Sequence, residues 1–457
     1  MLDSLFDLLV DVNGVMWGYV LIILLCGTGL FFTIKLKFIQ IRDFGKGWNL
    51  LFKDFSFSGK RGENGEMTPF QAVSTAIAGQ VGTGNLAGAA TALISGGPGA
   101  IFWMWMSAFF GMATIYAEAV LAQNFKTVDK YEEVTGGPVY YIKAAFKGNL
   151  GKILSTAFAI FIVLALGLMG NMVQSNSIGT AFAGTFAENG IQINPIYIGI
   201  VLAILATFIF MGGTARLASV VEKLVPFMAV VYILGSLILL ILNIRNFPEA
   251  LRMIFVGAFN PSAVVGGAAG IGVQQAIRYG VARGLFSNEA GMGSTPHAHA
   301  RAAARNPHEQ GLVAMVSVFI DTFIILNLTA FSILCSGALA TGASGIALPQ
   351  AAFATAFGGF GSVFISICLF FFAFSTILSW HFFGAINIKH LFGEKSVKFY
   401  SLFVIAAIIV GSYLKVDFVW ELSDFFNGLM VIPNVLALVA LRKLVAKISK
   451  ENDVKLD

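Results

Sequence analysis

Long apolar runs separated by short polar segments recur along the whole chain, and most reach about 20 residues, the length of a membrane-crossing helix. Eleven spans are predicted, at roughly 14–36, 68–95, 99–124, 151–187, 194–213, 217–243, 263–286, 309–336, 360–388, 397–414 and 417–441. The fourth is too long for a straight crossing, so it must tilt or extend beyond the bilayer. Residues 40–66 and 127–150 are amphipathic or loop segments, and GGPVYYIKAAFKG within the second predicts a short surface helix.

The composition agrees with a polytopic membrane protein. The chain has 457 residues, of which 57% are hydrophobic and 12% are charged, and its mean hydropathy is +0.82. A soluble domain carries about 25% charged residues. We therefore expect an all-α integral membrane protein, multi-pass in the plasma (inner) membrane.

The positions of the basic residues predict how the chain is oriented. If the N-terminus lies outside and the spans alternate, the outward loops hold only three of the 29 Lys and Arg residues, namely Arg245, Arg252 and Lys415. Seven lie in the first inward loop, between Lys35 and Arg61. Because cytoplasmic loops carry the excess of Lys and Arg, the N-terminus is expected outside and the C-terminus in the cytoplasm. The net charge of +5 then reflects orientation in the bilayer and predicts no nucleic-acid partner.

The number of spans predicts an internal repeat within a single transport domain over residues 1–457. The first span and its cytoplasmic loop, 14–66, stand apart as one extra N-terminal helix, and 442–457 form a cytoplasmic tail. The remaining ten spans divide into two sets of five, at 68–243 and 263–441. Since five is odd, the two successive sets have opposite orientations, which is the condition for an inverted repeat.

Two glycine-rich stretches interrupt spans at corresponding positions of the two sets. The first is AGQVGTGNLAG at residues 78–88, and the second is GGAAGIG at residues 266–272. Gly82, Gly84 and Ala87 fit the spacing of a dinucleotide-binding turn, but that fold needs a preceding strand and an acidic residue about 20 positions on, which are absent. Close helix packing by Gly84 and Gly88 is the simpler alternative. Interruptions at matching positions favour a transport site between two discontinuous helices.

The chemistry expected at the first interruption follows from its unpaired backbone groups, which survive in a membrane only when buried in protein or facing a cavity. The carbonyls of 78–81 are free for a sodium ion, and the amides near Thr83 and Gly84 suit a carboxylate. Gly82 forms the turn, and Asn85 stands where a helix N-cap is expected. Gln80 is a polar side chain at membrane depth, where such residues are often functional.

The stretch GQVGTGNLAGAATAL, together with GVARGLFSNEAGMGSTPHAHA at residues 280–300, resembles the alanine or glycine:cation symporter family, the sodium:alanine symporters. The resemblance covers essentially the whole chain and implies a fold like that of the bacterial leucine transporter. That fold has a five-plus-five inverted repeat with discontinuous first and sixth core helices. It implies sodium-driven import of a small neutral amino acid, such as alanine or glycine, by alternating access. Sodium is then the coupling ion, and no organic cofactor is expected.

The resemblance also implies site residues. It assigns sodium to the carbonyls of Gly79, Val81 and Phe372 and to the hydroxyls of Ser375 and Thr376. The alternative for the two hydroxyls is a bond back to carbonyls one turn earlier. In the seventh span, Gly270 would accept the substrate ammonium, Ile271 would limit side-chain volume, and Gln274 would bind substrate or another helix. Trp380 follows Thr376 by one turn on the same helix face and could wall the pocket.

Several other polar residues leave alternatives open. Glu118 and Asp321 could carry protons in a proton-coupled transporter of the same fold, but structural pairing is the favoured explanation for both. Arg278, Arg283 and Glu289 could form an inner gate of ion pairs or remain solvated. His297 and His299 read as ordinary loop histidines without a third metal ligand. No nucleophile, Walker A or zinc-protease motif occurs, so an enzyme is not favoured. The two aligned interruptions, without a tandem pore-like repeat, argue against a channel as well.

Overall fold

The computed structural model describes residues 2–53, 66–261, 264, 272–414 and 417–453. These residues fold into an almost entirely helical protein with one two-stranded antiparallel hairpin. The elements run in this order: α1 (Leu2–Val15), η1 (Met16–Val20), α2 (Leu21–Lys35), α3 (Ile39–Arg42), α4 (Phe44–Lys53), α5 (Pro69–Gln80), η2 (Gly84–Gly88), α6 (Ala89–Gly96), α7 (Ala100–Asn124), β1 (Thr127–Val128), β2 (Val134–Thr135), α8 (Pro138–Ala145), α9 (Asn149–Ile162), η3 (Val163–Gly170), α10 (Asn171–Glu188), α11 (Pro195–Phe210), α12 (Gly213–Leu242), η4 (Ile244–Asn246), α13 (Phe247–Phe259), α15 (Val273–Asn288), α16 (Pro296–Ala300), α17 (Pro307–Phe319), η5 (Ile320–Leu326), α18 (Asn327–Ser336), η6 (Ala338–Thr341), α19 (Ala347–Phe357), α20 (Phe360–Phe392), α21 (Glu394–Tyr413), α22 (Asp417–Ala440) and α23 (Arg442–Asp453).

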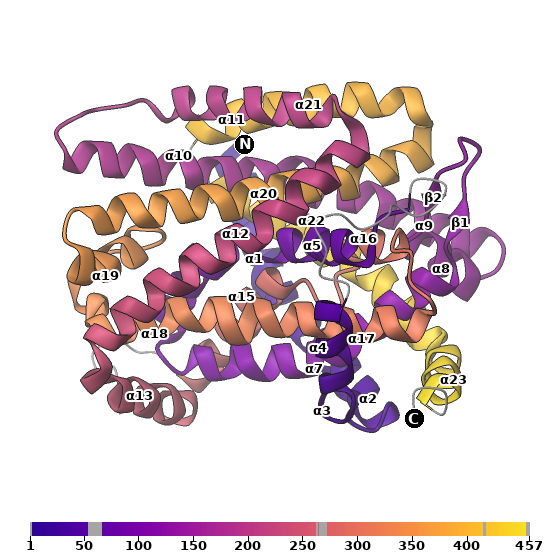
Figure 1. Cartoon of the computed structure of the whole chain (residues 1–457), viewed down its shortest axis with the longest axis horizontal. Coiled ribbons are helices and arrows are strands. Elements are labelled where there is room, and N and C mark those ends of the chain that lie inside the picture. The colour runs from indigo at the N-terminus through magenta and orange to yellow at the C-terminus, as the bar shows by residue number, and fades with distance from the viewer. Residues whose placement is uncertain (1, 54–65, 262–263, 265–271, 415–416, 454–457) are drawn as a thin grey trace.

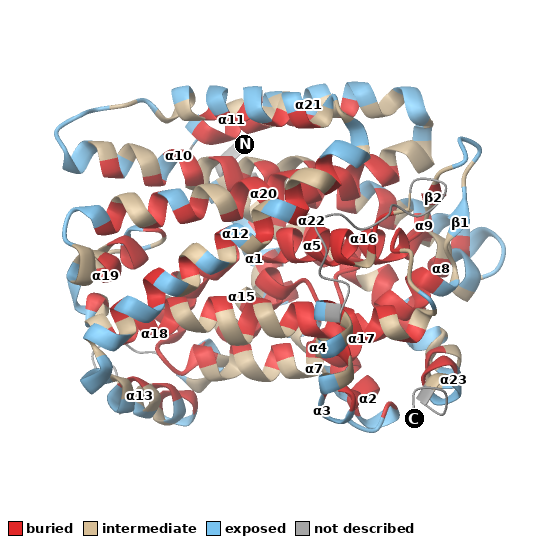
Figure 2. Ribbon diagram, in the orientation of Figure 1, coloured by how far each residue is buried: buried red, intermediate tan, exposed pale blue. Residues whose placement is uncertain are grey.

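The long helices lie side by side, and the elements next to the two interruptions are at the centre. In Figure 1, α12, α15, α17 and α20 cross the middle of the molecule, while α11 and α21 run together along one edge. Figure 2 shows buried residues concentrated around α5, α16, α20 and α22, with exposed residues along the outer helices. Many exposed side chains there are large and apolar, including Phe208, Leu402 and Phe403. Such a surface matches hydrocarbon rather than water.

The described segments support the predicted membrane spans in part. Eight helical segments are long and apolar enough to cross a bilayer, and Pro195–Phe210 is a shorter apolar helix. The fourth predicted span becomes Asn149–Glu188, 40 residues that contain the π-helical η3. At 1.5 Å per residue it is about 60 Å long, twice the hydrocarbon thickness, so it does extend beyond a straight crossing. The chain is thus a multi-pass helical membrane protein, while eleven crossings and the inverted repeat stay predictions.

Two predicted spans differ from a single straight helix. Span 68–95 is divided into α5 and the η2–α6 pair, as the glycine pattern predicted. Thr68 starts α5 with a capping box, in which its side chain accepts from the Gln71 amide and Gln71 accepts from the Thr68 amide. Span 263–286 is described only as α15, because the predicted interruption at 266–272 lies almost wholly outside the described residues.

The loop segments contain the short elements that join these helices. The stretch 127–150 holds the β1–β2 hairpin and α8, which confirms the predicted short helix there. Its Tyr141 and Ile142 side chains are buried, so α8 packs against the protein instead of lying free on a surface.

Candidate functional site

The first interruption lies where α5 ends at Gln80. Val81 adopts an extended backbone (φ −82°, ψ 91°), and η2 begins at Gly84. The Gly82 amide donates to Asn85 Oδ1 at 3.0 Å. Asn85 therefore stabilises the turn from inside η2 instead of from the N-cap position that the sequence predicted.

A second interruption separates α15 from α16. Residues 289–295 are non-helical, with positive φ at Glu289 (56°), Gly291 (86°) and Gly293 (82°). Their backbone amides are satisfied from α7, because the Glu118 carboxylate accepts from Gly291 N–H at 3.0 Å and from Gly293 N–H at 2.9 Å. Asn434 Nδ2 also donates to this carboxylate at 2.7 Å. Glu118 is thus paired with the unwound backbone between α15 and α16. The sequence had not predicted an interruption at this position.

The two interruptions face each other. Gln80 Nε2 donates to the Asn288 carbonyl at 2.8 Å. The Asp321 carboxylate joins both sides, since it accepts from Asn85 Nδ2 at 2.7 Å and from Ser287 Oγ at 3.0 Å. These contacts bring the end of α5, the start of η2 and the end of α15 together around Asp321 of η5 in the buried centre of the protein.

Three buried polar atoms beside the interruptions have no hydrogen-bond partner within the part of the chain that the structure describes. They are Gln80 Oε1 and Thr83 Oγ1 at the first interruption and Thr295 Oγ1 at the second. Leaving a buried polar atom unpaired costs about 1–3 kcal/mol, so such atoms are expected where a polar ligand binds. Next to them, the Thr83 amide donates to Gln174 Oε1 at 3.2 Å.

Glycine keeps this region open. A Cβ atom at Gly82 would lie 2.5 Å from Thr376 Oγ1 and 3.3 Å from the Gln174 amide. At Gly170 it would lie 2.5 Å from the Trp380 ring. Gly82, Thr83, Gln174 and Trp380 therefore surround one small region beside the first interruption. Gln174 escaped the sequence analysis, although a glutamine inside an apolar span was itself a signal.

Oxygen atoms converge on Thr376 from two helices. Its Oγ1 lies 2.8 Å from the Ala78 carbonyl, 3.3 Å from the Val81 carbonyl and 3.0 Å from the Phe372 carbonyl. Ser375 Oγ donates to the Phe372 carbonyl at 2.8 Å. One hydroxyl proton serves only one of three carbonyls, so the arrangement suits a hard monovalent cation bound by neutral oxygens. Ala78 thus joins Val81 and Phe372 at Thr376, and the assignment of the Gly79 carbonyl to sodium stays a prediction.

Trp380 borders the second interruption. Its Nε1–H donates to Glu289 Oε1 at 2.6 Å, and Ser294 Oγ donates to Glu289 Oε2 at 2.5 Å. Phe286 meets the Trp380 ring edge-on, with ring centroids 6.2 Å apart. Glu289 is fully buried and is bonded to Trp380 and Ser294, while Arg283 pairs with Asp424, so the structure does not show the inner gate of ion pairs considered for these residues.

Of the residues predicted from the seventh span, Gln274 does not join this centre. Gln274 is exposed, and its Nε2 donates to the Tyr19 hydroxyl at 2.9 Å. It lies near the far end of α15 from Asn288, about 21 Å along the axis at 1.5 Å per residue. Gly270 and Ile271 lie outside the described residues.

His297 and His299 are not loop residues, as the sequence suggested, but buried parts of α16. His297 lies within 2.8 Å of Asn387 Nδ2 and 2.7 Å of the Ser294 carbonyl, and its ring stacks near Phe158 and Phe383. Among the described residues, no group of three His, Cys, Asp or Glu side chains could hold a metal ion. The histidines are therefore packing residues that orient α16.

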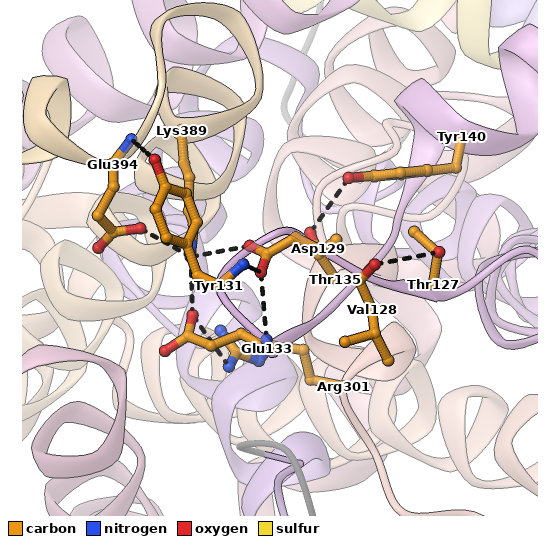
Figure 3. Close-up of polar contacts among 10 residues, drawn as sticks. All are labelled: Thr127, Val128, Asp129, Tyr131, Glu133, Thr135, Tyr140, Arg301, Lys389 and Glu394. Carbon is orange, nitrogen blue, oxygen red and sulfur yellow. Dashed lines mark hydrogen bonds and ion pairs between the residues drawn. The ribbon is translucent and has the colours of Figure 1, made fainter.

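A charged cluster closes the face that carries the hairpin (Figure 3). Lys389, near the end of α20, pairs with Asp129 at 2.9 Å, Glu133 at 3.0 Å and Glu394 at 2.7 Å. Arg301, which follows α16, reaches Glu133 at 3.7 Å. These contacts tie the hairpin to the ends of α16 and α20.

The start of α5 is held at the same face. Met67 N–H donates to the Arg301 carbonyl at 2.8 Å, and Ala303 N–H donates to the Met67 carbonyl at 3.0 Å. The segment that precedes α5 is thus joined to the segment that follows α16 at this face.

The comparisons with known proteins decide the family. A model of the sodium:alanine symporter family matches residues 2–456. The chain belongs to the sodium:alanine symporter family. This confirms the resemblance inferred from the two motifs, and it makes the chain a transmembrane protein of an amino acid transporter family.

Individual relatives agree along nearly the whole chain. The sodium/alanine symporter AgcS of Methanococcus maripaludis is 40% identical over 444 residues, covering 96% of this chain and 95% of that protein. The amino-acid carrier protein AlsT of Bacillus subtilis is 40% identical over 453 residues, covering 98% and 93%. A solved Eremococcus coleocola manganese transporter matches with a TM-score of 0.51 and 14% identity, covering 81% of this chain and 76% of that one. That last likeness concerns the fold alone.

The charged cluster makes a prediction for this transporter. Lys389→Gln removes the cation shared by three carboxylates, so we expect the hairpin face to open more often. Ala300 is buried close to Gly136, where an added Cβ atom would lie 2.7 Å from the Ala300 Cβ. A cysteine in place of Ala300 should then react several-fold faster with a membrane-impermeant thiol reagent. The exposed Lys395→Gln is the matched control. Equal labelling rates in both variants would show that the cluster does not hold the face closed.

The same cluster predicts a pH dependence. Burial raises the pKa of the Asp129 carboxyl, but hydrogen bonds from Lys389 and from the Tyr131 and Glu133 amides outweigh it and hold that pKa below its usual range. A depressed carboxyl pKa stabilises the closed face above the ordinary value of about 4, and the stabilisation is lost as the pH falls through the lowered pKa. The labelling rate of Ala300→Cys, divided by the rate for a free thiol at the same pH because the thiolate is the reacting form, should therefore stay low from neutral pH down to about pH 4.

Proposed function

We propose that the chain is a Na⁺-coupled symporter that imports a small neutral amino acid, such as alanine or glycine, by alternating access. The observation that carries the proposal is the convergence of the Ala78, Val81 and Phe372 carbonyls on the Thr376 hydroxyl beside an interrupted helix. Family membership supports amino acid transport by symport. The names of two relatives, a sodium/alanine symporter and an amino-acid carrier, point to the same substrate class.

In the proposed site, sodium binds between Thr376, Ser375 and the carbonyls of Ala78, Val81 and Phe372. The substrate carboxylate lies at the amides near Thr83 and Gly84, because helix N-termini attract anions. The unpaired Thr83 hydroxyl and Gln80 Oε1 bind the rest of the zwitterion. The Trp380 side chain forms one side of the proposed substrate site. A bound amino acid that favours the same conformation as sodium raises the affinity for sodium, and the coupling is reciprocal.

Alternating access is proposed to move the closed hairpin face relative to the rest of the bundle. In the predicted orientation, with the N-terminus outside, that face is cytoplasmic. The proposed arrangement is one extra helix over 14–66 and two five-helix repeats at 68–243 and 263–441. Opening would break the Lys389 cluster and the Met67–Arg301 pairing and release the substrate inward.

The assay that tests the function is uptake of labelled alanine by the purified protein in liposomes. An inward Na⁺ gradient is compared with equimolar K⁺ and with an imposed pH gradient. Saturable uptake that requires Na⁺ and is competed by glycine is the expected result. Absence of any Na⁺ stimulation of uptake would overturn the proposal.

A substitution tests the sodium site separately. Thr376→Val keeps the shape of the side chain but removes the oxygen, so we expect the Na⁺ concentration for half-maximal uptake to rise about tenfold, equivalent to ~1.4 kcal/mol. Thr91→Val is the control, because Thr91 also bonds back to a carbonyl one turn earlier, at 2.8 Å, but lies outside the proposed site. An unchanged Na⁺ dependence in Thr376→Val would place the ion elsewhere.

A proton-coupled transporter of the same fold is the second candidate, and one observation favours it. The carboxylates of Glu118, Glu289 and Asp321 are fully buried around the interruptions, and their recorded hydrogen-bond donors are amides, hydroxyls and an indole instead of cations. Such groups can exchange a proton. Uptake that follows the pH gradient and ignores Na⁺ would decide for this alternative.

A further inference from the structure

A cavity of about 200 Å³ lies outside the central site, between the extra N-terminal helical segment and the core. Asn13, Gly14 and Trp17 line it from α1 and η1, while Arg278 and Arg283 line it from α15. Glu421 and Asp424 of α22 complete it. One water occupies about 30 Å³, so the cavity has room for a small organic molecule.

Two residues that line this cavity each carry a buried atom without a hydrogen-bond partner among the described residues: Asn13 Oδ1, an acceptor, and Arg283 Nε–H, a donor. Asn13 is only 5% exposed. Its amide nitrogen is used, since it donates to Glu421 Oε2 at 2.6 Å and to the Glu421 carbonyl at 2.8 Å. An unpaired acceptor and an unpaired donor in one cavity call for a ligand that offers both a donor and an acceptor.

The lining also carries charged side chains of both signs. Arg283 holds Asp424 at 3.4 Å, a single loose contact, and Arg278 has no ion-pair partner among the described residues, with its guanidinium above the Tyr279 ring. Glu421 and Asp424 supply two negative charges against these two positive ones. A neutral cavity with separated charges of both signs suits a zwitterion better than an anion or a cation alone.

We propose that this cavity is a second binding site for a zwitterionic α-amino acid. The ligand carboxylate meets Arg278 and the Arg283 Nε–H. Its ammonium meets Asn13 Oδ1 and the acidic residues of α22. The choice of an amino acid rests on the proposed function, whereas the zwitterionic class follows from the lining.

An aromatic layer separates this cavity from the central site. The Arg283 guanidinium lies 5.6 Å from the Trp420 ring centroid, and Trp420 is 5.4 Å from Phe286. Phe286 in turn contacts Trp380, with centroids 6.2 Å apart. This series of ring contacts links the lining of the cavity to Trp380, beside the proposed central site.

The test measures how many labelled alanine molecules the purified protein binds in saturating Na⁺, by equilibrium dialysis. Gly82→Ala blocks the central site, and Gly14→Leu fills the cavity. A Cβ atom at Gly14 meets only Arg278 Nη2, at 3.8 Å, so the larger side chain is accommodated without backbone contact. Gly27→Leu is the control, because a Cβ atom at Gly27 meets nothing within 4 Å.

Wild-type protein and Gly27→Leu should bind two molecules, each single site variant one, and the double variant none. Arg278→Gln in the Gly82→Ala background should weaken the remaining binding about tenfold, through loss of a charge-assisted hydrogen bond. Absence of binding to Gly82→Ala, or residual binding that Gly14→Leu leaves intact, overturns the proposal. Failure of the proposed function is read separately, as absence of Na⁺-driven uptake by the wild-type protein in liposomes.

Discussion

Gly82→Ala is expected to abolish most Na⁺-driven uptake while the protein remains folded and inserted. The added Cβ atom would lie 2.5 Å from Thr376 Oγ1 and 3.3 Å from the Gln174 side chain, so it occupies the space between the proposed sodium and substrate sites. Overpacking costs about 1–3 kcal/mol. If that cost falls on the bound state, it lowers ligand affinity by about 5- to 150-fold.

The matched control is Gly88→Ala, on the same interrupted segment. There a Cβ atom approaches nothing nearer than the Thr83 carbonyl, at 3.9 Å, so the substitution is accommodated. Both variants are compared for uptake in liposomes and for thermal unfolding. Normal uptake by Gly82→Ala would show that neither ligand needs the space beside Thr376.

The second large effect is expected at Glu118. Its carboxylate accepts the Gly291 and Gly293 amides of the second interruption, and among the described residues no other group takes both. Glu118→Leu leaves two buried donors unpaired, at a cost of about 1–3 kcal/mol each. The segment 289–295 should lose its shape, and with it the bonds from Trp380 and Ser294 to Glu289. We expect uptake to fall at least tenfold and the melting temperature to drop.

Glu118→Gln separates shape from charge. The glutamine oxygen can still accept one amide, but its NH₂ group is a donor and faces the other, so an intermediate loss of uptake is expected. Glu188→Gln, on an exposed position at the end of α10, is the control. Full activity of Glu118→Leu would mean that the second interruption keeps its shape without this carboxylate.

The sequence alone was sufficient to predict the class of protein and the first interruption. Apolar runs of membrane-crossing length and few charges lead to a helical membrane protein, since the bilayer leaves little other choice for the backbone. Gly82 and Gly84 in an apolar run predicted the break after Gln80, because the unwound turn is a local property of those residues. Thr376 was likewise associated with Val81 and Phe372, through the family resemblance.

Only the tertiary structure decided where the second interruption lies among the described residues and what stabilises it. The glycine-rich 266–272 gave the stronger local signal, whereas the break at 289–295 also depends on Glu118 and Asn434, which are distant in the sequence. Other features also depend on residues that are distant in the sequence. They are the hydrogen bond from Trp380 to Glu289, the contact of Gln174 with Thr83, and the cavity between Asn13 and Arg283. Hydrophobic periodicity and glycine positions report local backbone preferences, whereas these contacts arise from helix packing between residues far apart in the chain.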